Sequence, residues 1–181
     1  MRGKAHLISG IVTGIVTAIG TNSFTEGIGK SAIIVTASAI GSLLPDIDLP
    51  TSTIGKKLKP ISLIINKMFG HRTITHSPLW IIPLFALYYF LPSIATELSS
   101  NTTLNLRWLI IGYISGFICH LVGDMLTTGG IPFAYPFSRK RLRLTPIESG
   151  KHDIILTCVT IGLFILFWIF VSNAGVIFNK M

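Results

Sequence analysis

Five long apolar segments alternate with shorter polar segments along the chain. They cover residues 5–21, 28–44, 78–96, 107–128 and 154–172. A helix of about 20 apolar residues is long enough to cross the hydrocarbon core of a bilayer. The pattern therefore predicts an all-α fold: a polytopic membrane helix bundle of about five transmembrane helices, in a single integral membrane domain over residues 1–181.

Residues 54–70 have a different pattern, in which basic and apolar residues share a helix. This amphipathic composition is typical of a helix that lies in the membrane interface. Before it, Pro45 and Pro50 favour a rigid, non-helical turn. After it, Ser77 and Pro78 suit the N-cap and first turn of a helix, so we expect the third span to begin there.

A lane of small and polar residues runs along one face of the fourth segment. Its members are Gly112, Ser115, Gly116, Cys119, His120, Gly123 and Asp124. Small residues let neighbouring helices approach closely, and Gly10 and Gly14 of the first segment have a spacing that serves the same purpose. His120 and Asp124 are four residues apart, which places imidazole and carboxylate about 5–6 Å apart at Cβ. The two side chains are therefore close enough to share a metal ion.

The composition excludes an ordinary soluble domain. Half of the residues are hydrophobic and 12% are charged, about half the charged fraction of soluble domains. The two cysteines, Cys119 and Cys158, lie in apolar segments and provide neither a disulfide framework nor a cysteine-based zinc knuckle. The N-terminal 20 residues also have the basic start and short apolar core of a signal peptide. We expect them to be retained, since the topology below requires them.

Basic residues are distributed unevenly between the two sides of the predicted bundle. With the N-terminus in the cytoplasm, the inner side holds Arg2, Lys4, Lys56, Lys57, Lys59, Lys67, Arg72, Arg139, Lys140, Arg141, Arg143 and Lys151. The outer side holds Lys30, Arg107 and Lys180. This asymmetry follows the positive-inside rule and accounts for the net charge of +8 without a nucleic-acid partner. We interpret residues 139–143 as a topology determinant that contacts anionic lipid headgroups.

Every histidine and aspartate lies at or near the cytoplasmic end of a predicted span. They are His6, Asp46, Asp48, His71, His76, His120, Asp124, His152 and Asp153. Ionisable groups at membrane depth are costly and usually mark a functional site. Imidazoles and carboxylates without thiolates suit a divalent metal. Zinc is the favoured ion, with manganese or iron as alternatives, and the donors suffice for one or two ions.

Each candidate ligand also has an ordinary structural interpretation. His120 and Asp124 could be a hydrogen-bonded pair that joins two helices. Asp46 and Asp48 could cap a turn between prolines. His6 could be an anchor at the membrane interface.

The segments before the third and fifth spans leave similar alternatives open. His71 and His76 are five residues apart and converge only if their segment is a turn that enters a helix. Arg72 could hold a phosphate oxygen or contact a lipid headgroup. Asp153 is a natural N-cap for the last helix, and His152 could be merely exposed.

Three motifs, PDIDLPTS, GHRTITHS and HLVGDMLTTGGIP, occur in this order, after His6 and before a basic segment. Together they resemble the YdjM-type family of bacterial membrane-bound, metal-dependent hydrolases, over roughly residues 6–150. The resemblance implies a metal site made of His6, Asp46, Asp48, His71, His76, His120 and Asp124. It also implies a surrounding shell of Arg72, Thr75, Ser77, Thr127 and Pro132. Family members tend to carry a glutamate after the basic segment, where this chain has SGKHDI and Asp153 could substitute.

The order of histidines and aspartates is also distantly similar to that of zinc-dependent phospholipase C and S1-type nucleases. This similarity is an analogy with all-helical phosphoester hydrolases. We therefore expect a membrane hydrolase of the bacterial cytoplasmic membrane, acting at the cytoplasmic headgroup layer. Its substrate would be a phospholipid or another lipid-linked phosphoester.

Three residues are the candidates for catalysis. Asp46 or Asp48 would take the proton of a metal-activated water, and Arg72 would receive the phosphate. The alternative is a non-enzymatic metal-binding membrane protein: an ion carrier, a sensor or a structural metal site.

Overall fold

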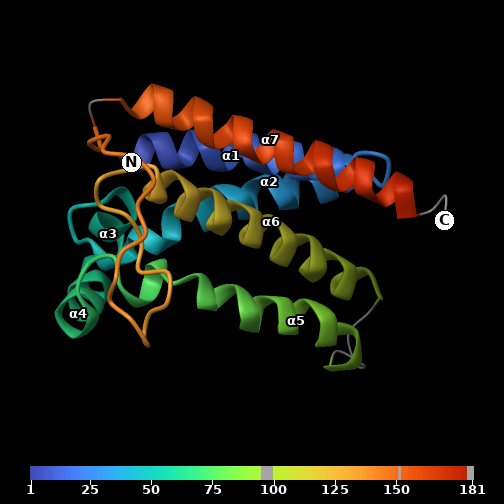
Figure 1. The fold of residues 1–181 in the computed structure, drawn as a ribbon. Coiled ribbons are helices and arrows are strands. Elements are labelled where there is room, and N and C mark those ends of the chain that lie inside the picture. Colours follow the sequence, from blue (N-terminus) through green and yellow to red (C-terminus); the bar gives the residue numbers. More distant parts are fainter. Residues whose placement is uncertain (95–99, 151, 179–181) are drawn as a thin grey trace.

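The computed structural model describes residues 1–94, 100–150 and 152–178 as a helical bundle (Figure 1). Its α-helices are α1 (Gly3–Gly20), α2 (Ile28–Leu43), α3 (Thr53–Lys57), α4 (Lys59–Phe69), α5 (Ile81–Ile94), α6 (Ser100–Met125) and α7 (Asp153–Phe178). Short 3-10 turns are η1 (Leu44–Asp48), η2 (Ile74–His76) and η3 (Pro78–Trp80). The prediction of an all-α membrane helix bundle is confirmed.

Among the described residues, four helical stretches are long and apolar enough to cross a membrane. They are Gly3–Gly20, Ile28–Asp48, Asn105–Met125 and Asp153–Phe170. The predicted third span corresponds to a shorter apolar stretch, Pro78–Phe90, and its predicted last residues, 95 and 96, lie outside the described residues. Where the bilayer begins and ends along each helix stays a prediction.

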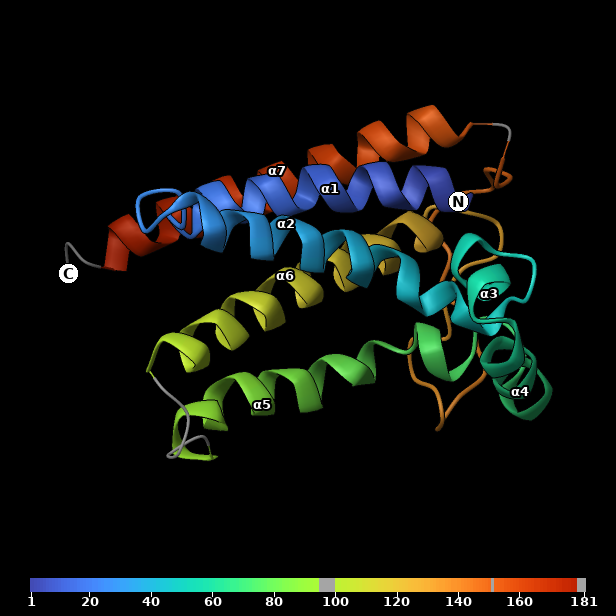
Figure 2. The ribbon, with the colours of Figure 1, turned by 180° about the vertical axis from the view of Figure 1, so that it is seen from behind.

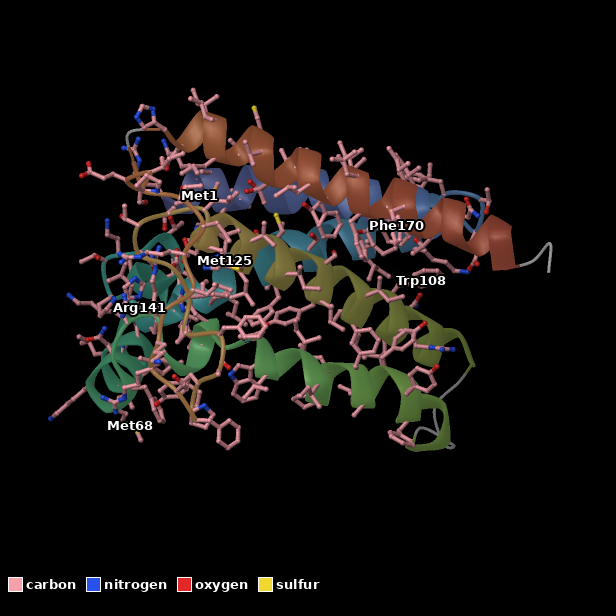
Figure 3. All side chains as sticks on the ribbon, in the orientation of Figure 1. Met1, Met68, Trp108, Met125, Arg141 and Phe170 are labelled. Carbon is pink, nitrogen blue, oxygen red and sulfur yellow. The ribbon has the colours of Figure 1, made fainter. Side chains whose placement is uncertain are left out.

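The helices are arranged around α6. Helices α1, α2 and α6 pack against one another, α7 lies along α1, and α5 lies along α6 (Figures 1 and 2). The N-terminus, α3, α4 and the long connection between α6 and α7 gather at one end of the bundle (Figure 1). We call this end the polar end. It is also where the nitrogen atoms of the basic side chains concentrate, around Arg141 and Met1, away from Trp108 and Phe170 (Figure 3).

The predicted lane of small residues on α6 is a helix contact. A side chain at Gly116 would collide with the backbone of Ser38 on α2. Ser38 in turn donates a hydrogen bond from Oγ to the carbonyl of Gly10 on α1, at 2.7 Å. This close packing of three helices fixes the face of α6 that carries His120 and Asp124.

The amphipathic segment predicted over residues 54–70 differs from a single helix. It forms α3 and α4, which are separated at Leu58. Pro60 lies in the first turn of α4, where a missing N–H costs nothing, whereas the same residue within a longer helix would remove a backbone bond. Ile64 and Met68 of α4 are 59% and 67% exposed. The position of α4 in the membrane interface stays a prediction.

Candidate metal centre

All seven residues expected to bind metal meet at the polar end of the bundle. The segments that deliver them are the first turn of α1, the turn η1, the stretch between α4 and α5, and the last turns of α6. They form three overlapping groups whose donor atoms lie within 4.8 Å of one another. The groups are His6, His120 and Asp124; Asp46, His76 and His120; and Asp46, Asp48 and His71.

Four donor atoms from these groups lie near one another, and we call them the four-donor set. They are Nε2 of His76, Nε2 of His120, Oδ2 of Asp124 and Oδ1 of Asp46. The two imidazole nitrogens are 3.2 Å apart. Asp124 Oδ2 lies 3.5 Å from the His76 nitrogen and 3.6 Å from the His120 nitrogen. Asp46 Oδ1 lies 3.7 and 3.9 Å from the same two nitrogens. A tetrahedral zinc site has ligand atoms about 3.3 Å apart, so the set fits a zinc-sized ion.

Hydrogen bonds on the far side of each ring turn the two Nε2 atoms toward the carboxylate oxygens of the set. His120 Nδ1 lies 2.7 Å from the carbonyl oxygen of Ser42, to which it donates. His76 Nδ1 lies 3.2 Å from Asp48 Oδ2 and 3.0 Å from Thr75 Oγ1. Metal-binding histidines commonly have a carbonyl or carboxylate partner of this kind, which fixes the tautomer and leaves the other nitrogen free for the ion.

Asp48 holds several parts of the centre at once. Its Oδ1 lies 2.7 Å from Nδ1 of His71, and its Oδ2 accepts hydrogen bonds from the backbone N–H of Arg72 (2.9 Å) and from Thr75 Oγ1. These contacts explain how His71 and His76, five residues apart, converge: the segment is a turn that leads into α5, as expected. Asp48 also belongs to a group of potential metal ligands with Asp46 and His71.

The two carboxylate oxygens of Asp124 differ in their hydrogen-bond partners. Oδ1 lies 2.8 Å from the amino group of Met1 and 2.8 Å from Nη2 of Arg72. Oδ2 is buried and has no hydrogen-bond partner among the described residues. A protonated His76 can place positive charge 3.5 Å from this oxygen, but without a hydrogen bond. A buried carboxylate oxygen that lacks a hydrogen bond costs free energy, and a metal cation bound to it would lower that cost.

His6 lies beside the four-donor set. Its ring stacks on His120 with 3.9 Å between centroids, and its Nε2 is 3.3 Å from Asp124 Oδ1. It is 1% exposed, and neither ring nitrogen has a hydrogen-bond partner in the described part of the chain. His6 is therefore positioned for a second ligand group, on the side of Asp124 that Arg72 and Met1 already occupy.

The pKa of His76 reflects the negative charge of the carboxylates around it. Burial lowers the pKa of its imidazole, but the carboxylates of Asp124, Asp46 and Asp48 outweigh burial and raise that pKa to about 10. A proton on His76 thus balances the carboxylates, which shows that the centre favours a positive charge.

A cavity of about 1020 Å³ gives access to the centre from the polar end. Asp46, His71 and Arg72 line it. His120 and Asp124, in contrast, are fully buried. Arg72, expected to receive a phosphate, also pairs with Asp124, and its backbone has a left-handed φ of 55°.

The other motif residues support the loop above the centre. Thr127 donates to the carbonyl of Asp124 at 2.8 Å, and Ser77 donates to the carbonyl of Tyr135 at 2.8 Å. Pro132 lies in the same loop, beside the isolated bridge between Ile131 and Leu142.

The residues that precede the last helix lie apart from the four-donor set. Asp153 accepts a hydrogen bond from the N–H of Gly150 (3.0 Å) and pairs with Nε of Arg2 (2.8 Å) at the start of α7. His152 is exposed.

The carbonyl of Ser42 is a functional group that sequence reasoning did not find. Pro45, which supplies no N–H to the preceding turn, was the available signal that an acceptor there is free.

The fold and the site define a multi-pass membrane protein with buried histidine and aspartate groups that could hold a metal ion. The family model described as "YdjM inner membrane protein" matches residues 1–179, and the chain belongs to this family of inner membrane proteins. The inner membrane protein YdjM of Escherichia coli (strain K12) is 31% identical over 172 residues, covering 91% of this chain and 80% of that protein. The uncharacterized protein YvsG of Bacillus subtilis (strain 168) is 31% identical over 166 residues, covering 90% of this chain and 91% of that protein. No solved structure matches.

Proposed function

We propose that the protein is a membrane-embedded, metal-dependent hydrolase that acts on a phospholipid or another lipid-linked phosphoester. The observation that carries this proposal is the four-donor set, with its unpartnered Asp124 oxygen, next to a cavity that opens at the polar end. The asymmetry of basic residues supports a cytoplasmic location for this end.

His76, His120 and Asp124 are the residues that would hold the ion. Their donors are two imidazoles and a carboxylate, which suit zinc and also manganese or iron. A divalent ion in this position supplies Lewis acidity, which polarises a phosphoryl oxygen and lowers the pKa of a water molecule. Arg72 already compensates the other oxygen of Asp124, at 2.8 Å, so one ion fits the centre better than two.

Asp46 and His71 suit the proton transfers. Asp46 Oδ1 has the longest distances in the four-donor set, 3.7 and 3.9 Å, and Asp46 lines the cavity. It can therefore take the proton of an attacking water. His71 lines the same cavity, and Asp48 holds its Nδ1, so His71 can give a proton to the leaving group. Asp48, in this account, orients His71 and His76 instead of reacting.

The alternative function is a non-enzymatic one, as an ion carrier, a sensor or a structural metal site. Within the described ranges, the residue groups that could hold a metal all lie at the polar end. A carrier needs further polar sites along a path across the bilayer. The clustering at one end therefore favours hydrolysis at the membrane surface.

The test is a lipid screen with purified, zinc-loaded protein in vesicles of phosphatidylethanolamine, phosphatidylglycerol and cardiolipin. We expect zinc-dependent release of phosphate, headgroup or fatty acid from one of these lipids. Asp46→Asn should abolish release and still bind zinc. Zinc flux into the vesicles without lipid turnover, lost in His120→Ala, would establish the carrier and reject the hydrolase.

A further inference from the structure

The cavity at the metal centre continues to the outer surface of the bundle. Besides the residues of the centre, its lining includes Ile8 of α1 and Ile154, Thr157 and Cys158 of α7. Ile8 is 54% exposed and Ile154 is 80% exposed. Both belong to helical stretches that are apolar and long enough to span a membrane. One continuous cavity therefore extends from Asp46, His71 and Arg72 to an exposed groove between the N-terminal ends of α1 and α7, which lie side by side (Figures 1 and 2).

The charges along this cavity are suited to an anion. Arg2, Lys4 and Arg72 line it. Its acidic lining residues are Asp46 and Asp153, so its basic side chains outnumber its carboxylates by three to two. Arg2 pairs with Asp153, and Arg72 pairs with Asp124. A phosphate can thus meet cationic side chains on its way from the surface to the centre.

We propose that a phosphate-bearing membrane lipid enters this cavity sideways from the bilayer, between α1 and α7. Its hydrocarbon chain lies against Ile8 and Ile154, and its phosphate lies toward Arg72 and His71. The hydrolysis of the bound lipid rests on the proposed function. The position of the bound lipid can be measured without any turnover.

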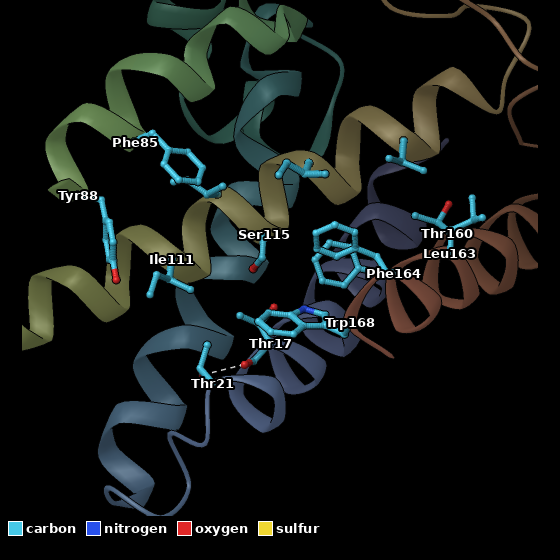
Figure 4. A pocket seen from close by; sticks show the side chains of 14 residues that line it. Thr17, Thr21, Phe85, Tyr88, Ile111, Ser115, Thr160, Leu163, Phe164 and Trp168 are labelled. Atoms are coloured by element: carbon cyan, nitrogen blue, oxygen red, sulfur yellow. Dashed lines mark hydrogen bonds between the residues drawn. The ribbon is translucent and has the colours of Figure 1, made fainter. Parts of the chain in front are cut away.

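A second cavity offers a contrast within the same bundle. It has a volume of about 590 Å³ and lies between α1, α5, α6 and α7, where side chains such as Phe85, Ile111, Phe164 and Trp168 line it (Figure 4). Its lining is apolar and hydroxyl-bearing. This lining suits a hydrocarbon chain, and the described residues that form it include no basic side chain that could bind a phosphate.

Photo-crosslinking tests where the lipid binds. The probe is phosphatidylglycerol with a diazirine near the headgroup end of one acyl chain, in nanodiscs that contain the full-length protein. Peptide mapping should place label around Ile8 and Ile154, at about tenfold the level found around Phe164, which corresponds to about 1.4 kcal/mol of preference. Thr157→Trp, which fills the groove, should lower that label about tenfold. Leu166→Trp is the matched control: Leu166 is 63% exposed on α7 and lies outside the linings of both cavities.

Chemical modification of Cys158 is a second test of lipid entry. Cys158 is exposed and Cys119 is buried, so a bulky maleimide should react at Cys158. Modification should stop lipid hydrolysis and spare hydrolysis of a soluble phosphoester, and Cys158→Ser should be insensitive to the reagent.

The outcomes separate the two proposals. Label in the groove without any turnover supports the lipid site and rejects the hydrolase. Turnover that survives Thr157→Trp, with label mainly around Phe164, overturns lateral entry and leaves the hydrolase standing. Label spread evenly over all lipid-facing helices also overturns lateral entry.

Discussion

The polar atoms of the apolar cavity and those of the metal centre have different hydrogen-bond partners. In the apolar cavity, hydroxyl groups bond within their own helices: Thr17 donates to the carbonyl of Thr13 (2.9 Å), and Thr160 donates to the carbonyl of Leu156 (2.8 Å). At the metal centre, Asp124 Oδ2 is buried without a hydrogen-bond partner among the described residues. The indole N–H of Trp168 also lacks one, but a neutral donor costs less to leave unpaired than a carboxylate does.

The difference between the apolar cavity and the metal centre indicates where a metal ion would bind. Ile111 and Ile114 of α6 line the apolar cavity, whereas His120 and Asp124, on the opposite face of the same helix, belong to the metal centre. Thr17 and Thr160 of the apolar cavity donate to carbonyls of their own helices, whereas a buried carboxylate oxygen at the metal centre has no hydrogen bond within the described part of the chain. The following predictions test whether that difference is functional.

Removing a ligand should have the largest effect. His120→Ala deletes one Nε2 of the four-donor set, so zinc affinity should fall by more than about 100-fold, beyond the range of residues that only orient ligands. Competition with a fluorescent chelator measures this loss. His152→Ala, at an exposed histidine, is the control and should keep wild-type affinity. Equal affinity in both variants would remove His120 from the centre.

Removing an orienting carboxylate should have a smaller effect. Asp48→Asn weakens the contacts that hold His71 and His76, and zinc affinity should fall about 10- to 100-fold. The same chelator assay applies, with Asp153→Asn as the matched change at a residue that pairs with Arg2. A loss as large as that of His120→Ala would mean that Asp48 is itself a ligand.

Zinc affinity should rise with pH. In the metal-free protein the pKa of His76 is raised to about 10, so below that pH zinc must displace a proton from this residue. Between about pH 6.5 and 10, affinity should rise about tenfold per pH unit for each proton displaced. The same raised pKa stabilises the metal-free fold, fully below about pH 6.5, and the contribution is lost as pH rises through about 10. Zinc titrations in buffers across this range measure the slope, and a flat profile would contradict the account.

Close helix packing should be sensitive to one methyl group. Gly116→Ala places Cβ against the backbone of Ser38 and should destabilise the bundle by about 1–3 kcal/mol. Gly162→Ala on α7 meets no atom within 4 Å among those described and should be nearly neutral. Thermal unfolding in detergent compares the two variants. Equal melting temperatures would argue against the tight contact between α2 and α6.

A change in the apolar cavity should have the smallest effect. Ile118→Val removes one methylene from its lining and should cost about 0.5–1.5 kcal/mol of stability. Zinc affinity should stay at the wild-type value, because the substitution leaves the four-donor set intact. A loss of zinc binding in this variant would show that the two cavities are coupled.

Sequence pattern predicted the bundle because apolar length and small-residue spacing are local properties. The lane on α6 predicted a close helix contact and the shared face of His120 and Asp124, and the structure identifies α2 as the partner in that contact. The break at Leu58 was missed, because the basic and apolar periodicity continues through it and the effect of Pro60 depends on where a helix starts. The candidate ligands were predicted as a set, from their distribution and from the family resemblance.

The separate roles within that set were not predictable from spacing. Asp46 and Asp48 are two residues apart in one 3-10 turn, yet one faces the other donors and the other holds His71 and Thr75. Only the tertiary arrangement distinguishes them. The same holds for Arg72, whose pairing with Asp124 joins residues far apart in the sequence.

The most direct test of the central claim is the metal content of detergent-purified protein, measured by elemental mass spectrometry. After reconstitution, the wild type should contain about one equivalent of zinc, manganese or iron, as expected for one ion held by His76, His120 and Asp124. His76→Ala and Asp124→Asn, which alter motifs far apart in the chain, should both lose it while remaining folded. Metal-free wild type, or metal retained in both variants, would contradict the claim that these residues build one metal centre.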